Sequence, residues 1–147
     1  MRRKDREMPE SFALSVMDKC EWAALSMISP EGEPYCVPVT IAREGAWVYF
    51  HTAPAGQKID CLRRNPRVCL VCVGDTHRIP EKFTTEYECA IARGEAQEVT
   101  QASEKTHALR CICERPAASN LAQFQQAVDR SLSVTGIWKI RLLTVTG

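Results

Sequence analysis

The chain has 147 residues, of which 45% are hydrophobic and 25% charged, a composition that fits one soluble domain with a buried core. Nineteen lysine and arginine residues against eighteen acidic residues give a net charge of +1, too little for the strong positive field of a dedicated nucleic-acid binder. The longest apolar run, residues 68–73, is far shorter than the roughly 20 residues that cross a bilayer. We expect no nucleic-acid partner and no membrane insertion.

The first nine residues are rich in charge and are not followed by an apolar stretch. This pattern does not match a secretory or twin-arginine signal, and it predicts a cytoplasmic protein by default. We therefore expect a single domain over residues 1–147, with residues 1–9 as a flexible N-terminal segment.

The rest of the chain shows strand patterns with few helical ones between them. Residues 67–73 are apolar on both faces, which indicates a central strand, and Gly94 predicts a bulge inside a long strand. Six strands with peripheral helices indicate a mainly β (α+β) fold built as a small barrel. In chain order we expect a helix over 10–19, three meandering antiparallel strands over 22–29, 35–42 and 46–52, a helix over 55–65, a strand over 67–73, a polar connection over 74–84, a strand over 85–99, helices over 102–116 and 124–132, and a last strand from about 134.

Eight cysteines are many for this length. Cys69 and Cys72 lie three apart on a predicted strand and so point to opposite faces, while Cys111 and Cys113 lie two apart on a predicted helix, about 200° apart around its axis. Neither spacing suits one shared ion. We expect most of the cysteines to be reduced and buried as small hydrophobic residues, which suits the cytoplasm.

The usual nucleotide-binding and hydrolase motifs are absent from the sequence. The three histidines, His51, His77 and His107, have no mutual spacing typical of metal ligands, so no metal site is expected. What remains is a strand that delivers His51 and Thr52 to a turn, followed by a helix opening at Gly56 with Gln57 and Lys58. The backbone N–H groups of a helix start and the charge of Lys58 favour a phosphate, although a lysine in a first turn is often simply solvated.

Residues 35–42, 47–59, 65–75 and 84–99, with the order of the elements, resemble the flavin-binding split-barrel proteins related to pyridoxamine 5′-phosphate oxidase. Within that superfamily the chain is most similar to the nitroimidazole-resistance (Nim) group, from about Ser11 onward. The resemblance implies a six-stranded antiparallel FMN-binding split β-barrel. It also implies a homodimer that holds two FMN molecules in clefts between the subunits.

The resemblance further implies a role for each matching position. Gln57 stands where the oxidase family typically has an arginine, and Arg63 or Arg64 could partly replace that charge. The implied cofactor-binding residues are Val37, Pro38 and Val39, whose backbone would follow the isoalloxazine ring; Phe50, His51 and Thr52 on the next strand; and Gln57 and Lys58 at the phosphate.

His51 carries the catalytic hypothesis because the Nim-like group has a histidine in the matching strand. Strand alternation places Trp47, Tyr49 and His51 on one face, and an imidazole there could donate a proton near neutral pH. The alternative is a structural histidine. Trp138 and Arg141 on the last strand could close the cleft, or Trp138 could belong to the core.

Three alternative functions are compatible with these observations. The first is an FMN-dependent oxidoreductase that passes two electrons to a nitroimidazole or another small aromatic acceptor, with its electron donor left open. The second is a non-catalytic flavin- or haem-binding protein, such as a store, carrier or sensor of the same fold. The third is a ligand-free structural dimer. The sequence does not discriminate between FMN, a deazaflavin and haem.

Overall fold

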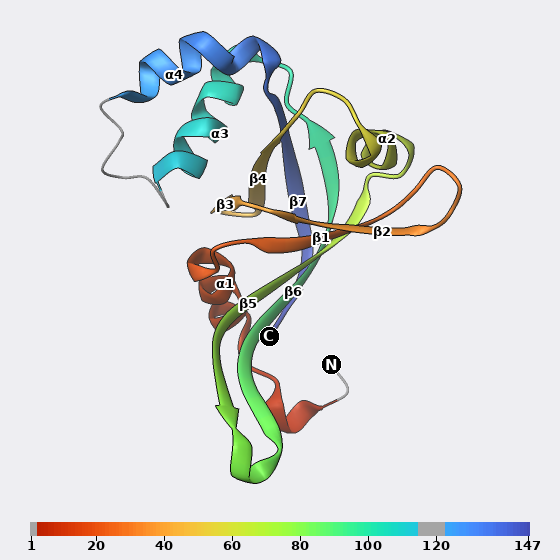
Figure 1. The fold of residues 1–147 in the computed structure, drawn as a ribbon, viewed down its shortest axis with the longest axis vertical. Coiled ribbons are helices and arrows are strands. Elements are labelled where there is room, and N and C mark those ends of the chain that lie inside the picture. The colour runs from red at the N-terminus through yellow and green to blue at the C-terminus, as the bar shows by residue number, and fades with distance from the viewer. Residues whose placement is uncertain (1–2, 115–122) are drawn as a thin grey trace.

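The protein is represented by a computed structural model, which describes residues 3–114 and 123–147. One antiparallel sheet dominates this part of the chain, with helices at its periphery (Figure 1). The strands are β1 (Ala23–Ile28), β2 (Pro34–Val39), β3 (Ile41–Glu44), β4 (Trp47–Thr52), β5 (Arg67–Ile79), β6 (Thr84–Glu98) and β7 (Gly136–Thr146), and the helices are α1 (Glu10–Lys19), α2 (Gln57–Arg64), α3 (Ala102–Glu114) and α4 (Phe124–Ser131), with short 3₁₀ turns at Lys4–Arg6, Pro80–Lys82 and Leu132–Val134.

The strand order across the sheet is β2-β1-β5-β6-β7-β4-β3, so β2 and β3 form its two opposite edges. These edge strands are consecutive in the chain and are separated only by Thr40. The sheet must therefore curve until its two edges come close together, although β2 and β3 do not pair. The result is an open, split barrel.

The structure differs from two expectations about the number of strands and their pairing. The predicted strand over 35–42 divides at Thr40, so the described part of the chain has seven strands and not six. The predicted three-stranded meander is also wrong, because β2 pairs with β1 while β3 pairs with β4. The apolar pattern runs unbroken through Thr40 and hides the point at which the chain leaves one edge for the other.

The long hairpin of β5 and β6 projects at the lower end of the molecule (Figure 1). Residues 74–84, predicted as a polar connection, mostly continue the strands: Thr76 pairs with Tyr87, and Ile79 pairs with Thr84. This prediction was wrong because the outer part of the hairpin exposes both faces to solvent and shows no apolar alternation. Phe83 at the tip has a φ of 49° and is 98% exposed.

The main core fills the inside of the barrel under α1 and α2, and a smaller core lies between the sheet and α3. In the main core Phe50 of β4 and Trp138 of β7 are paired in register, and both are buried. The smaller core is centred on Tyr49, Ile137 and Ile112. Within the described residues, no helix is both long enough and apolar enough to span a bilayer.

All eight cysteines are free. Cys72 is buried and Cys69 is partly exposed, in agreement with their opposite directions on β5. The expectation that most cysteines are buried is wrong, because only Cys20, Cys61 and Cys72 are fully buried and Cys36 is exposed.

The predicted bulge at Gly94 is confirmed by a register shift between Arg93 and Gly94 where β6 pairs with β7. A Cβ atom added to Gly94 would lie 2.4 Å from the backbone oxygen of Arg141 and 2.6 Å from Cγ2 of Ile140. Both neighbours belong to β7 and one is backbone, so neither can move aside without disturbing the ladder. The glycine allows β6 and β7 to approach closely at the bulge.

We expect Gly94→Ala to lower the free energy of unfolding by about 2 kcal/mol, measured by chemical denaturation. Gly74→Ala is the matched control, because its nearest neighbours are the flexible ends of Glu88 and Lys19. The control should stay within about 1 kcal/mol of the wild type. Equal effects of the two substitutions would contradict the assignment.

Candidate functional site

The two edges of the sheet and the start of α2 meet at one corner of the barrel. We call this the strand–helix corner and define it by Val37–Val39, His51–Thr52 and Gln57–Lys58. β3 pairs with β4 only as far as Phe50, which faces Ile41. The last two residues of β4 therefore extend beyond β3 and pair only with β7, through Ile137 and Gly136.

Helix α2 is fixed to the barrel by its apolar face. Ile59, Cys61 and Leu62 are buried in the main core. Its N-terminus follows Gly56, whose φ of +124° is a conformation that glycine adopts readily and other residues rarely do. Among the residues that the structure describes, no side chain caps this end of the helix. The first N–H groups of α2 are thus left for water or for a ligand.

Lys58 is half-buried at this helix start. Its Nζ lies 5.8 Å from the centre of the Phe50 ring, which places the ammonium directly beside β4. Burial lowers the pKa of this ammonium, since the charged form is partly removed from water. Among the ion pairs of the described residues, none joins Lys58 to a carboxylate. A charged group that is partly desolvated and unpaired is well suited to receive an anion.

In strand β2, which was predicted to follow the isoalloxazine ring, mainly the backbone is free for contact with a ligand. Val39 is buried in the main core and Val37 packs against it, whereas Pro38 is exposed. Because β2 is an edge strand, one side of its backbone has no strand partner. Pro38 carries no N–H, so any donor on this edge must come from a neighbouring residue. Phe50 is fully buried, and its side chain belongs to the core.

The predicted alternation along β4 is present, but its outer face is divided in two. Tyr49 is buried and Trp47 partly covered in the smaller core near α3, while His51 is exposed at the end of the strand. The three residues share one face as predicted, but only His51 among them is exposed. The helix α3 covers the aromatic residues and leaves the imidazole in solvent.

Three further sequence-predicted residues lie away from the corner or are committed to other contacts. Trp138 is 3% exposed and belongs to the main core. Arg141 pairs with Trp47, at the opposite end of β4 from His51, and its guanidinium lies 3.5 Å from Glu95. Arg63 lies 3.0 Å from Glu98. The Arg63 guanidinium is thus used in an ion pair, and a partial replacement by Arg63 or Arg64 of the arginine that the resemblance implied at Gln57 stays a prediction.

A second group of chemically active side chains lies at the other end of β4. Glu44 at the end of β3 and His107 and Cys111 on α3 bring their ligand atoms within 4.8 Å of one another. In the sequence, His107 and Cys111 are four residues apart, a signal that the comparison of Cys111 with Cys113 left unused. That spacing places two side chains on the same face of a helix.

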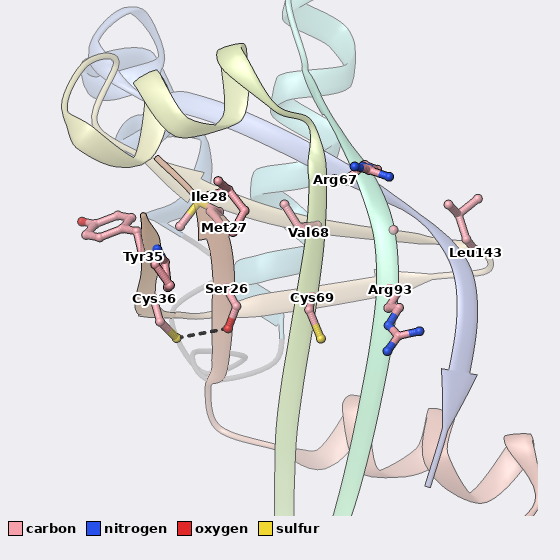
Figure 2. A pocket seen from close by; sticks show the side chains of 12 residues that line it. Ser26, Met27, Ile28, Tyr35, Cys36, Arg67, Val68, Cys69, Arg93 and Leu143 are labelled. Carbon is pink, nitrogen blue, oxygen red and sulfur yellow. Dashed lines mark hydrogen bonds between the residues drawn. The ribbon is translucent and has the colours of Figure 1, made fainter. Parts of the chain in front are cut away.

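An open groove of about 520 Å³ lies on the outer face of the sheet. Figure 2 shows it from close by, with Ser26 of β1 between Cys36 of β2 and Cys69 of β5, and Leu143 on the far side. Its lining is mostly apolar, and Ile28 and Leu143 are 40% and 51% exposed. Ser26 donates a hydrogen bond to the sulfur of Cys36 at 3.4 Å.

A family model described as pyridoxamine 5′-phosphate oxidase matches residues 13–147. A search of curated proteins found no match.

Several solved structures share the fold. One is a "putative 5-nitroimidazole antibiotic resistance protein" from Bacteroides thetaiotaomicron, with a TM-score of 0.80, 23% identity, and coverage of 95% of this chain and 84% of that one. An FAD- and haem-binding protein from Mycobacterium smegmatis gives a TM-score of 0.78 at 14% identity, covering 95% and 69%. An FAD-binding protein from Mesorhizobium loti gives 0.68 at 18% identity, covering 96% and 94%.

Proposed function

Because this chain belongs to the pyridoxamine 5′-phosphate oxidase family over residues 13–147, we propose that its strand–helix corner binds FMN and that the protein is a flavin-dependent oxidoreductase. The observation that carries this proposal is the half-buried Lys58 ammonium at the uncapped start of α2. Solved structures of the same fold include flavin-binding and flavin- and haem-binding proteins, and this supports a flavin as the ligand class.

The corner suits the phosphate of FMN on physical grounds. The free N–H groups at the start of α2 and the partial positive charge of the helix end attract a dianion, and Lys58 adds a full charge. Gly56 leaves open space, since a Cβ atom built there meets no atom within 4 Å. A phosphate would also compensate the desolvated ammonium, so binding should relieve a local cost of the ligand-free fold.

The isoalloxazine ring is proposed to lie along β2. This edge strand has backbone groups without a strand partner, and such groups can recognise the polar edge of a ring as they recognise an added strand. Val39, which is buried, and Val37, which is partly buried against the core, would hold the strand in place. The contribution of Phe50 is its buried ring beneath Lys58, which positions the ammonium.

We expect Lys58→Met to weaken FMN binding by roughly 10- to 100-fold, because it removes a charge-assisted contact to the phosphate. Riboflavin lacks that phosphate, so its affinity should change much less. The measurement is fluorescence titration of each flavin against wild type and variant. Arg63→Met on the same helix is the matched control, because the Arg63 guanidinium already pairs with Glu98 of β6. Equal losses for FMN and riboflavin in Lys58→Met would contradict the phosphate assignment.

The proposed reaction is the reduction of a nitroimidazole or another small aromatic compound. When bound, the flavin supplies the two electrons and is itself restored by an external donor. His51 is proposed to supply a proton to the substrate, because its imidazole is exposed at the corner while the other residues of that face lie near α3.

We expect His51→Asn to slow oxidation of the reduced protein by a nitroimidazole about 10- to 100-fold while FMN affinity stays within a factor of about three. Anaerobic stopped-flow absorbance follows the rate. His77→Asn on the projecting hairpin is the control and should behave as wild type. An unchanged rate in His51→Asn would leave His51 a structural residue.

We also propose that the protein is a homodimer in which the groove of Figure 2 faces a second copy. The exposed apolar side chains at Ile28 and Leu143 support this, because such surface is costly to leave in water. A second subunit would also cover the flavin at the corner.

Leu143→Glu should convert the dimer to a monomer, since it puts a charge into a buried apolar contact, and sedimentation velocity measures the change. Val134→Glu is the matched control: Val134 is 64% exposed but does not line the groove. Dissociation by the control substitution, or a dimer that persists in Leu143→Glu, would place the interface elsewhere.

A further inference from the structure

We infer that Glu44, His107 and Cys111 form a zinc site that joins α3 to the β3–β4 hairpin. This inference is independent of the flavin, because Glu44 pairs with Trp47 at the end of β4 opposite His51. The three side chains supply one oxygen, one nitrogen and one sulfur atom, all within 4.8 Å of one another. Such a mixed donor set suits Zn²⁺, which prefers tetrahedral coordination by cysteine, histidine and carboxylate.

Two of the three distances between ligand atoms lie near those that zinc requires, and the third, from Glu44 to Cys111, is at most 4.8 Å. Ligand bonds of about 2.0 to 2.3 Å at tetrahedral angles separate neighbouring ligand atoms by about 3.3 to 3.5 Å. Cys111 Sγ lies 3.6 Å from His107 Nε2. Glu44 Oε2 lies 2.8 Å from the same Nε2, so this pair needs to open by about 0.5 Å, which an exposed glutamate can do by rotating its side chain.

The two ligands on α3 are held in place by secondary structure. His107 and Cys111 are four residues apart on α3 and therefore project from one face of the helix. The His107 ring packs edge-on against Tyr49, with 6.2 Å between ring centres and 87° between ring planes. Tyr49 is itself buried, so it restricts the orientation of the imidazole.

No competing cation occupies this cluster. Among the ion pairs of the described residues, Glu44 is joined to His107 and to no lysine or arginine. The neighbouring basic residues are engaged elsewhere: Arg43 pairs with Asp18, and Lys139 pairs with Glu104 at 2.7 Å. All three candidate ligands are exposed or partly exposed, so an ion can reach them.

Three protein ligands leave a fourth position for water or another small ligand. Cys111 would bind as the thiolate and release its proton to solvent. Since Glu44 comes from the sheet and the other two ligands from α3, the bound ion would stabilise the contact of α3 with the sheet.

The test uses the full chain stripped of metal with a chelator and then titrated with Zn²⁺ or with Co²⁺ as a spectroscopic probe. We expect one ion per chain, a thiolate-to-cobalt charge-transfer absorption, and a melting temperature that rises with zinc, because the site exists only in the folded protein. Cys111→Ser should abolish the absorption and weaken zinc binding by about 100-fold, and Glu44→Gln should weaken it by about 10-fold.

Cys113→Ser is the matched control, because it removes a thiol from the same helix that is not part of the cluster. It should keep the absorption and the thermal shift. His107→Asn keeps all eight cysteines and is expected to lose the thermal shift, so it tests the site even if Cys111→Ser folds poorly. Equal zinc affinities in wild type and His107→Asn, or a cobalt absorption that depends on Cys113 and not on Cys111, would overturn the inference.

Discussion

The single residue between β2 and β3 determines how the whole sheet is shaped. Thr40 joins the two outermost strands of the sheet, so the sheet has to curve until those edges approach each other. The curvature encloses the main core, in which Phe50 and Trp138 are paired across β4 and β7. It also places the free edge of β2 near the end of β4, where the chain turns into α2. The candidate cofactor site thus lies where the two edges of the curved sheet approach each other without pairing.

Local sequence patterns were sufficient to predict the elements whose formation depends on residues close to one another in the sequence. The helix over 10–19 was predicted because its buried residues recur at helical spacing. The bulge at Gly94 was predicted because a glycine inside a long strand weakens the strand unless a neighbouring strand approaches closely there. The division at Thr40 and the outer half of the β5–β6 hairpin were missed. Both depend on which strand pairs with which, and neither leaves a periodic apolar signal in the sequence.

The same distinction applies to the two sites. Gly56, Gln57 and Lys58 are adjacent in the chain, and their arrangement follows from one turn and one helix start, so sequence reasoning could assemble them. The commitment of Arg63 to Glu98, from a distant strand, was not visible in any local pattern. His107 and Cys111 carried a readable helical spacing, but Glu44 joins them only because α3 packs on β3, and that contact is established by the tertiary fold.

The projecting hairpin has a practical consequence for work on this protein. Its tip at Phe83 points into solvent and lies beyond the part of β5 and β6 that contributes to the core (Figure 1). The backbone there already turns through a left-handed residue, and nothing in either candidate site comes from this segment. A fluorescent label or a short epitope grafted at the tip would report on the molecule without entering the barrel. Extra residues inserted at Thr40, in contrast, would move apart the two sheet edges formed by β2 and β3.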